Sequence, residues 1–507
     1  MSGAGIPYTN LGDAVRRGEP DAPALIALSG AAPRTLTYRE LDAAADALAR
    51  GLLRHGLRRG ESVAILAANR AEFLTAFLGT MRAGLVSVPI NHKLPPATVA
   101  FIVEDCGARL VLCDEERRHL CPDDAQAVLF GPEYDALLSP GAFEAVVPAD
   151  AEPAMILYTS GSTGRPKGVV LSHQSHLWVL SQRLRPPGPP QRPLVAAPLY
   201  HMNALAVSQA AFVNGDAVIL LPSFTARGYI AAASRHRATA LTSVPTMMAM
   251  MVAEMMTERG ALREADLSSV RAIRMGSAPV SPSLLHAIRA LFPAAEIANG
   301  YGTTEAGPVC FEPHPGGLPT PDLSVGVQHP AVAMRLVDDA GREADEGVLH
   351  QKCPALMNGY HNLPEATRRV MTADGFYVTG DVFRRDENGF FFFVGRADDM
   401  FVCGGENVYP GEVEAVLGGH PGIMQAVVVP VPDDIKGQKP VAFVVRRDPA
   451  LSEAAVKEYA LARAAPYLHP RRVWFLPELP LAGTNKVDRR RLAEQALALV
   501  TEEATNE

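Results

Sequence analysis

The chain has 507 residues, 48% hydrophobic and 20% charged, with a formal net charge of -8 and a pI of about 6.0. This length exceeds one ordinary hydrophobic core and predicts roughly two to four domains. The composition excludes a disordered chain, and the lack of a basic surplus argues against DNA or RNA as the main partner. The N-terminal third alternates between helical and strand patterns, which favours an open α/β sheet covered on both faces.

The first predicted helix begins at a capping box formed by Thr37 and Glu40. Behind it, strands are predicted at 62–66, 86–90 and 109–113, with helices over 71–81 and 97–104. Further strands are predicted at 155–158, 217–221 and 271–275, and the Pro-rich segment 184–193 is predicted to be a surface loop.

The chain changes character in its last third. Gly/Pro turns and short β-rich runs over 312–395 predict a small β subdomain. After Arg396 we expect a compact α/β unit with strands at 427–431 and 441–445 and a helix over 452–464. A last helix is predicted after Asp488, which is a suitable N-cap.

Six cysteines are scattered without a CxxC pair, which fits a reducing compartment better than a disulfide framework or a zinc site. The N-terminus has no basic segment followed by an apolar one, and the C-terminal Thr-Asn-Glu is no peroxisomal signal. No uncharged apolar run reaches the length of a membrane span. We therefore expect a cytoplasmic protein.

A loop rich in glycine and hydroxyl side chains, 158–168, follows a predicted strand. Glycines let the backbone N–H groups approach an anion, and hydroxyls and a lysine add donors and positive charge, which suits a polyphosphate. The spacing is not that of a Walker A loop. The candidate phosphate-binding residues are Thr159, Ser160, Gly161, Ser162, Thr163, Gly164 and Lys167. The alternative is a flexible Ser/Gly surface loop.

A second cluster covers residues 299–305. Tyr301 offers an aromatic face between small neighbours that include Gly302, and Thr304 can donate to a phosphate oxygen. Glu305 is a carboxylate through which Mg²⁺ could be bridged to phosphates. The alternative is a polar turn with a solvated glutamate.

Three more motifs follow in chain order. Asp381 could accept both hydroxyls of a ribose, and Arg396 is a permanent cation; the alternative is that the two pair with each other or with solvent. Gly404 and Gly405 permit close approach of a ligand, and equally suit a hairpin turn before a helix. Lys486, near the end of the chain, carries almost no information by itself.

Together and in this order, the five motifs resemble the acyl-adenylate-forming superfamily of acyl- and aryl-CoA synthetases, peptide-synthetase adenylation domains and luciferases. The resemblance spans about residues 35 to 492. It implies an α/β fold, with a large N-terminal domain of stacked α/β subdomains (1–397, including the β subdomain at about 312–395). A hinge at Asp398 would join this domain to a mobile C-terminal α+β domain, 398–507.

The resemblance also implies a role for each motif. Ser162, Thr163 and Lys167 would hold the β- and γ-phosphates of ATP. Tyr301 would stack on adenine with Asn299 near its edge, Thr304 would contact the α-phosphate and Glu305 would hold Mg²⁺. Asp381 and Arg396 would bind the ribose, and Gly404 and Gly405 would line a pantetheine tunnel after domain rotation. Lys486 would reach the carboxylate and the α-phosphate during adenylation, although Asn485 stands where most relatives have glycine.

The implied activity is that of an ATP-dependent carboxylic acid:CoA ligase, with a small-molecule acid, ATP, Mg²⁺ and CoA as its partners. No enzyme nucleophile is needed, and none is evident. His201 in Pro-Leu-Tyr-His-Met-Asn would close the acyl pocket, whereas the alternative is a buried histidine with a backbone partner. The segments expected to line the pocket are 200–205, 243–248, 276–279, 300–302 and 307–310.

The pocket segments favour an apolar aromatic or medium-chain acid. Gly300 and Gly307 leave room, and the methionines at 202, 247 and 248 supply an adaptable lining. No aspartate that could pair with an α-ammonium lies between Pro198 and Leu205, which argues against an amino acid substrate.

Three alternatives stay open at this point: an enzyme that loads a carrier protein, a luciferase-like oxygenase, and a nucleotide-binding regulator without catalysis. The assembly state is equally open, with a homodimer as one arrangement.

Overall fold

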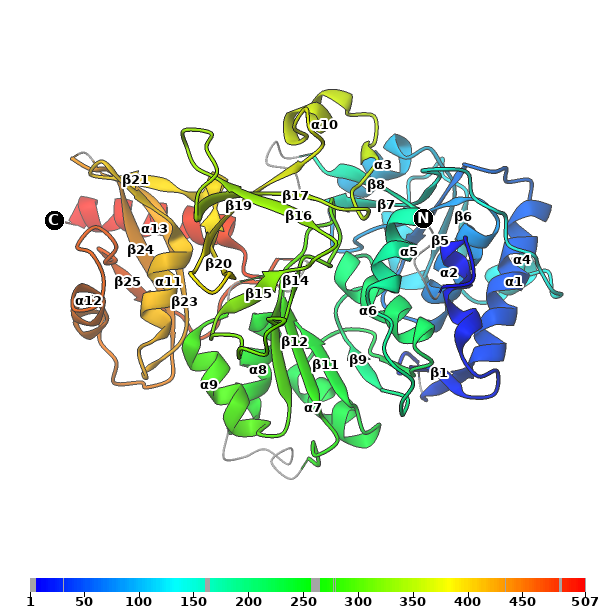
Figure 1. The fold of residues 1–507 in the computed structure, drawn as a ribbon, viewed down its shortest axis with the longest axis horizontal. Coiled ribbons are helices and arrows are strands. Elements are labelled where there is room, and N and C mark those ends of the chain that lie inside the picture. Colours follow the sequence, from blue (N-terminus) through cyan, green and yellow to red (C-terminus); the bar gives the residue numbers. More distant parts are fainter. Residues whose placement is uncertain are drawn as a thin grey trace.

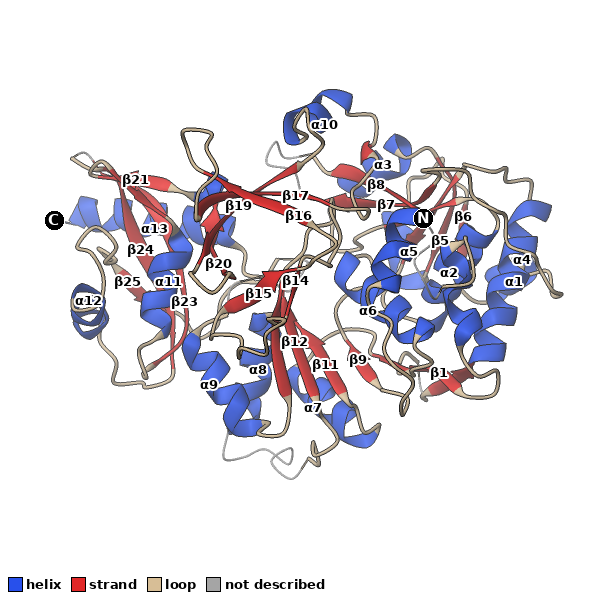
Figure 2. Cartoon of the chain, in the orientation of Figure 1, coloured by secondary structure: helices blue, strands red, loops and turns tan. Residues whose placement is uncertain are grey.

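The computed structural model describes residues 6–30, 32–159, 165–256, 265–276, 278, 280–433, 435–482 and 486–506. Within these residues the strands form two seven-stranded sheets, one six-stranded sheet and one five-stranded sheet. The N-terminal part, blue to cyan, and the C-terminal part, orange to red, lie at opposite ends of the long axis (Figure 1). Helices cover the faces of the sheets, as Figure 2 shows, so the predicted α/β class is confirmed.

The first seven-stranded sheet has the order β18-β8-β7-β4-β3-β5-β6. Its strands are β3 (Ser62–Leu66), β4 (Val86–Pro89), β5 (Ala108–Cys113), β6 (Ala127–Leu129), β7 (Pro153–Thr159), β8 (Lys167–Ser172) and β18 (Gly359–Tyr360). The strands from β3 to β7 pair in parallel, whereas β8 and β18 are antiparallel. All residues of β3 are buried, which explains its continuous apolar run.

The second seven-stranded sheet has the order β13-β12-β11-β9-β10-β1-β2. Its strands are β1 (Pro23–Ala27), β2 (Arg34–Thr37), β9 (Pro193–Val195), β10 (Val218–Leu220), β11 (Ala240–Ser243), β12 (Ala272–Gly276) and β13 (Glu296–Gly300). All pairings are parallel except that of β1 with β2. The predicted strands at 217–221 and 271–275 are therefore confirmed.

The six-stranded sheet is antiparallel and has the order β14-β15-β20-β19-β17-β16. Its strands are β14 (Phe311–Glu312), β15 (Ser324–Gln328), β16 (Ala333–Val337), β17 (Glu346–Lys352), β19 (Tyr377–Arg385) and β20 (Phe390–Arg396). The predicted β subdomain is thus present, with one difference. Its segment 359–360, β18, leaves this sheet and pairs with β8 of the first sheet, which ties the two together.

The five-stranded sheet belongs to the C-terminal part. Its strands are β21 (Phe401–Cys403), β22 (Glu406–Val408), β23 (Ile423–Asp433), β24 (Gly437–Arg446) and β25 (Val473–Phe475). The predicted strands at 427–431 and 441–445 lie within the long β23–β24 hairpin. This sheet carries α11 (Pro410–Gly418), α12 (Glu453–Leu461) and α13 (Arg489–Asn506).

The remaining helices cover the N-terminal sheets. They are η1 (Leu11–Arg17), α1 (Tyr38–Arg54), α2 (Ala71–Arg82), α3 (Pro96–Asp105), η2 (Glu115–Leu120), α4 (Pro132–Leu137), α5 (His173–Ser181), α6 (Met202–Val213), α7 (Ala226–Arg235), α8 (Pro245–Met256), α9 (Pro282–Leu291) and α10 (Pro364–Val370), with η4 (Ala397–Asp399) at the junction to the C-terminal part. The predicted capping box is formed: the Thr37 side chain accepts from the Glu40 backbone, and Glu40 accepts in return. None of the described helices is long and apolar enough to cross a membrane.

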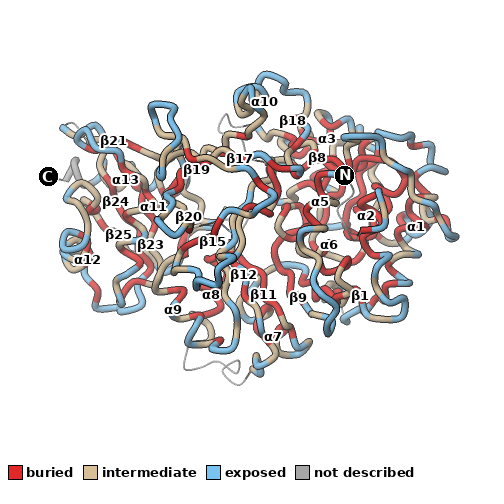
Figure 3. The backbone as a smooth tube through the Cα atoms, in the orientation of Figure 1, coloured by how far each residue is buried: buried red, intermediate tan, exposed pale blue. Residues whose placement is uncertain are grey.

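The largest core runs through α1, α2, α6 and the first sheet, and a second core lies under α7, α8 and α9. Figure 3 shows buried segments inside the sheets of both the N-terminal and the C-terminal part and exposed segments in the outer loops. The C-terminal part touches the N-terminal part at α9, where a Cβ added to Gly418 would lie 2.9 Å from Cβ of Ser281. The two parts therefore pack closely along this seam.

Candidate active site

The glycine- and hydroxyl-rich loop joins two paired strands. Thr159, the last residue of β7, lies opposite Lys167, the first residue of β8. Ser160, Gly161, Ser162, Thr163 and Gly164 lie outside the described residues, so their predicted phosphate-binding role stays a prediction. Lys167 is half-buried, with its amine 5.4 Å from the centroid of the Tyr360 ring. A cation is thus held at the base of this loop.

Glu305 is the carboxylate of the second motif. The Tyr360 hydroxyl donates to Glu305 Oε1 at 2.9 Å, and the Met357 N–H donates to the Glu305 carbonyl at 2.7 Å. Burial raises the pKa of the Glu305 carboxyl, while the hydrogen bonds from tyrosine side chains partly oppose that rise. Tyr360 thus contacts both Lys167 and Glu305, and sequence reasoning missed it. The only trace in the sequence is a tyrosine within Asn-Gly-Tyr, which no spacing marks, in a segment that had only been expected to be β-rich.

The surroundings of Glu305 suit a metal that brings most of its own ligands. Among the described residues no group of three or more acidic, histidine or cysteine side chains could enclose a metal ion. Mg²⁺ is commonly held by one or two carboxylates together with substrate phosphates and water. A single half-buried carboxylate that shares Tyr360 with Lys167 fits this mode, so Glu305 would hold Mg²⁺, which would neutralise phosphate charge there.

Tyr301, Asp381 and Arg396 form one hydrogen-bonded group. The Tyr301 hydroxyl donates to Asp381 Oδ2 at 2.5 Å, and Arg396 Nη1 donates to Asp381 Oδ1 at 3.0 Å. Burial raises the pKa of the Asp381 carboxyl, and Arg396 opposes that rise. The pairing of aspartate with arginine is the alternative weighed from the sequence. Since a carboxylate has about four acceptor sites, ribose hydroxyls can still bind alongside these partners.

The rest of the second motif shapes the backbone around this group. Asn299 lies on β13, and its Nδ2 donates to the Leu323 carbonyl at 3.2 Å. Thr304 lies in the turn closed by the bridge between Thr303 and Gly307. A Cβ added to Gly302 would lie 2.6 Å from Cα of Pro308, so glycine is needed there for chain packing. From the sequence, Gly302 had been expected only as a small neighbour of the Tyr301 ring.

Lys486 reaches this group from the C-terminal part. It lies in a turn between the bridged residues Leu481 and Val487, and its carbonyl accepts from the Ala482 N–H at 2.7 Å. Removal of its amine from bulk water lowers its pKa; Asp381 opposes this and Arg396 adds to it. The charge of Lys486 in turn contributes to lowering the pKa of His201. The structure thus brings Lys486, Asp381, Arg396 and His201 together, although they are far apart in the sequence.

The start of α13 holds the turn that carries Lys486. Arg489 Nη2 donates to Glu414 Oε2 at 2.7 Å and its Nη1 donates to the Val428 carbonyl at 3.1 Å. Asp488 caps the helix by accepting from the Arg491 N–H at 3.0 Å, as predicted. The start of α13, which follows shortly after Lys486, is therefore anchored to the C-terminal sheet.

His201 is the N-cap residue of α6, and its ring packs on Tyr200 with centroids 4.6 Å apart. Its Nε2 is buried and has no hydrogen-bond partner among the described residues. Burial, Lys486 and Lys93 lower its pKa to about 3, so the ring is neutral near pH 7. A buried Nε2 without a partner differs from the alternative of a histidine satisfied by the backbone, and it leaves this atom available to a ligand.

The remaining motif is a pair of glycines in the C-terminal part. Gly404 and Gly405 form the exposed turn of the β21–β22 hairpin, with φ of 64° and 92°. This conformation favours glycine, so the hairpin interpretation is confirmed. The role of the two glycines in a pantetheine tunnel stays a prediction.

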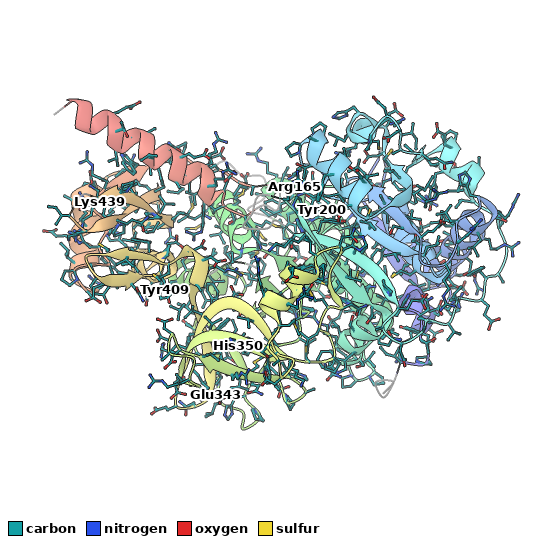
Figure 4. All side chains as sticks on the ribbon, turned by 90° about the horizontal axis from the view of Figure 1, so that it is seen from above. Arg165, Tyr200, Glu343, His350, Tyr409 and Lys439 are labelled. Carbon is teal, nitrogen blue, oxygen red and sulfur yellow. The ribbon has the colours of Figure 1, made fainter. Side chains whose placement is uncertain are left out.

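A cavity of about 540 Å³ opens at the carboxyl ends of strands in both seven-stranded sheets. Its lining includes His92, Lys93, Asp114, Glu116 and Arg117. The His92 ring packs on Tyr200 with centroids 5.2 Å apart, so rings lead from the cavity wall to His201. In Figure 4, Tyr200 and Arg165 lie in the centre of the molecule, whereas His350 and Glu343 lie at an outer edge.

The comparisons with known proteins agree with this geometry. The family model described as AMP-binding enzyme matches residues 13–361, and that of the AMP-binding enzyme C-terminal domain matches 412–486. The chain is 32% identical to a sulfoacetate–CoA ligase of Cupriavidus necator, over 94% of this chain and 95% of that one. It is also 32% identical to the fatty acid–[acyl-carrier-protein] ligase ScoC of Streptomyces coeruleorubidus, over 94% of each chain.

Among solved structures, the anthranilate CoA ligase AuaEII in complex with anthranoyl-AMP superposes with a TM-score of 0.88 at 26% identity, covering 99% of this chain and 100% of that one. The chain therefore belongs to the AMP-binding enzyme family. Within that family it is an acid–thiol ligase of the AMP-forming acyl-CoA synthetase type.

Proposed function

We propose that the chain activates a carboxylic acid with Mg-ATP, forming acyl-AMP and pyrophosphate, and then transfers the acyl group to CoA with release of AMP. The observation that carries this proposal is the hydrogen-bonded group of Tyr301, Asp381 and Arg396, which Lys486 approaches from the C-terminal part closely enough for Asp381 and Arg396 to influence its pKa. The proposed domains are 1–397 and 398–507, with the hinge at Asp398.

The two half-reactions make different demands on this site. A carboxylate attacking the α-phosphorus meets like charge, so cations placed where charge develops lower the barrier. Lys486 would supply such a cation, and Thr304 would donate to the α-phosphate. Asp381 and Arg396 would hold the ribose, Tyr301 would face the adenine with Asn299 at its edge, and residues 160–164 with Lys167 would hold the outer phosphates. Adenylation needs no general base, because the acid is already ionised when it binds.

For the second half-reaction we propose that CoA approaches through the cavity that contains Lys93. Arg117 in that cavity is engaged by Asp114 and Glu116, at 2.9 and 2.8 Å. Lys93 is exposed and forms no ion pair with any described residue. It therefore remains available for a phosphate of CoA, in a cavity whose His92 packs on Tyr200, the neighbour of His201.

Replacing Lys93 with alanine tests this route. We expect KM for CoA to rise about three- to tenfold, the effect of losing one charge-assisted contact of about 1 kcal/mol. Acid-dependent pyrophosphate release without CoA should stay within about twofold of the wild-type rate, because a contact with CoA plays no part in adenylation. Lys457→Ala, which breaks a helical surface pair with Glu453, is the control. An unchanged KM for CoA would contradict this route.

We further propose that the body of the acid is apolar, either aromatic or of medium chain length. Met247 and Met248 are 1% and 0% exposed and pack in the core under α7, α8 and α9, which leaves Met202, at 9% exposure, as the methionine with surface for an apolar acid. The relatives act on sulfoacetate, on a fatty acid or on anthranilate by their names, so membership of the family leaves the acid open. The six buried free cysteines support a reducing compartment such as the cytoplasm.

Pyrophosphate release from Mg-ATP, measured over a panel of acids with and without CoA and with products identified by mass, tests the activity. We expect AMP and pyrophosphate that depend on the acid, and an acyl-CoA mass only when CoA is present. The name of ScoC favours one second candidate, transfer to a carrier protein. Acyl-AMP that ignores CoA but loads a phosphopantetheinylated carrier protein would establish that candidate. Absence of pyrophosphate with every acid would contradict the proposed activity.

A further inference from the structure

Residues 357–361, which include β18, link the segment of Glu305 to β8 through the backbone. At one end of this linking segment, the Met357 N–H donates to the Glu305 carbonyl at 2.7 Å. At the other end, the His361 N–H donates to the Gly168 carbonyl, also at 2.7 Å. The linking segment therefore holds the Glu305 motif and the base of the phosphate loop in a fixed relation to each other.

The linking segment is also held from its outer side. The Tyr360 N–H donates to Thr367 Oγ1, on α10, at 2.8 Å. His361 Nε2 lies 3.0 Å from the Asp105 carbonyl oxygen at the end of α3, and Asn362 Nδ2 donates to the same oxygen at 3.0 Å. Because the backbone is bonded on both sides and Tyr360 is only 9% exposed, its side chain has little freedom to turn away from the site.

The Tyr360 side chain meets the two motifs with two different parts. Its hydroxyl donates to Glu305 Oε1 at 2.9 Å, a normal hydrogen-bond length. The Lys167 amine lies 5.4 Å from the centroid of its ring, within the range of about 6 Å over which a cation interacts with an aromatic face. Glu305 and Lys167 are half-buried, so water screens these contacts less than it would on the surface. One side chain thus contacts the acidic group of one motif and the basic group of the other.

A carboxylate binds a metal better when a second group holds it in the binding orientation. The phenol can do this for Glu305, and since a carboxylate has about four acceptor sites, room for a metal remains. A lysine amine that is held beside a ring likewise loses less freedom when it binds a phosphate. We infer that Tyr360 is a positioning residue for adenylation: its hydroxyl orients Glu305 for Mg²⁺, and its ring holds Lys167 for the phosphates of ATP. This inference rests on the proposed adenylation with Mg-ATP.

Replacing Tyr360 with phenylalanine removes the hydroxyl and keeps the ring. We expect the Mg²⁺ concentration for half-maximal pyrophosphate release, measured without CoA, to rise about 10- to 100-fold, the usual cost of removing the partner of a metal ligand. KM for the acid should stay within about twofold, because Tyr360 contacts neither acid nor acyl pocket segment in this scheme. Thermal stabilisation by ATP, measured without acid, should need correspondingly more Mg²⁺. In EDTA, stabilisation by ATP should equal that of the wild type.

Replacing Tyr360 with leucine removes the ring as well. ATP should then bind about three- to tenfold more weakly than to the phenylalanine variant, the scale of one cation–π contact, and it should do so in EDTA too. The matched control is Tyr38→Phe in α1. Tyr38 is 2% exposed and its hydroxyl donates to the Asp216 carbonyl at 2.6 Å, so this variant also loses a buried phenol hydrogen bond. It should leave the Mg²⁺ requirement unchanged.

A double-mutant cycle with Glu305→Gln shows whether Tyr360 acts through Glu305. Because Glu305→Gln removes the metal-binding charge, Tyr360→Phe should raise the Mg²⁺ requirement for ATP binding no further in that background. Tyr360→Leu should still weaken ATP binding in EDTA there, because the contact of the ring with Lys167 does not involve Glu305. Thermal stabilisation by ATP measures both effects even in variants without turnover.

Several outcomes would overturn the inference. One is an unchanged Mg²⁺ requirement in Tyr360→Phe, including the case of a lowered Tm and kcat, which would indicate a purely structural role. Another is an equal rise in the Glu305→Gln background, since Tyr360 would then not act through Glu305. Equal ATP binding by the leucine and phenylalanine variants would remove the role of the ring. A wild-type protein that binds Mg-ATP but releases no pyrophosphate with any acid contradicts the proposed ligase activity, while the binding comparison still decides the contacts of Tyr360.

Discussion

Replacing Lys486 with alanine should slow acyl-AMP formation by about 100- to 1,000-fold, the cost of removing one donor aimed at developing charge. The amine lies near Asp381, Arg396 and His201, where the attacking carboxylate and the α-phosphate would meet. Thioester formation from supplied acyl-AMP should stay largely intact, because in that step the phosphate leaves as AMP without a new P–O bond. Single-turnover pyrophosphate release and acyl-CoA formation from synthetic acyl-AMP measure the two steps separately.

The matched control is Lys439→Ala, in the same C-terminal sheet. Lys439 pairs with Asp433 at 3.4 Å and lies in the long β23–β24 hairpin, remote from the centre of the molecule (Figure 4). Its loss should change neither half-reaction. Equal losses in both half-reactions of Lys486→Ala would show that Lys486 has no specific role in adenylation.

Replacing Asp398 with proline should impair the second half-reaction about 100-fold, the scale of misplacing reacting groups by about 1 Å. Asp398 lies in η4, the short 3₁₀ turn between the N-terminal and C-terminal parts. Proline suits the φ of such a turn, so the arrangement seen here, with Lys486 at the site, should form normally. A rotation about this point needs new backbone dihedrals, which a fixed φ resists. Acyl-AMP should therefore accumulate while acyl-CoA formation slows.

Asp398→Ala serves as the control for this variant. It removes the same contact with Arg396, 3.5 Å away and largely exposed, while leaving the backbone free. Only the proline variant should therefore show the selective loss. If both variants lose the second half-reaction equally, the contact with Arg396 is what matters; if neither does, rotation does not take place at Asp398.

Local signals in the sequence were sufficient for many elements. The capping box at Thr37 and Glu40 and the N-cap Asp488 are both formed, and the buried strand 62–66 has the predicted bounds. These features depend on neighbouring residues, so a one-dimensional reading can find them. Segment 359–360 could not be read in this way, because its two residues join the first sheet only through pairing with β8.

The candidate site, too, could be predicted from the sequence only in part. Motif order along the chain pointed to the family and to Glu305, Asp381, Arg396 and Lys486, because each motif is a local pattern of chemically suitable residues. The sequence did not indicate Tyr360, which contacts Glu305 and Lys167, since a single phenol has no spacing that marks it.

By itself, then, the sequence determined the class of fold, the family and the chemistry of its motifs, because these are properties of short segments and of their order. Only the tertiary structure decided which side chains share a site. Lys486 comes within electrostatic reach of Asp381 because the C-terminal part packs along α9, and Tyr301 meets Asp381 because the end of β13 lies beside β19. The physical reason is that electrostatic and hydrogen-bonding energies depend on distance in space, which separation along the chain does not specify.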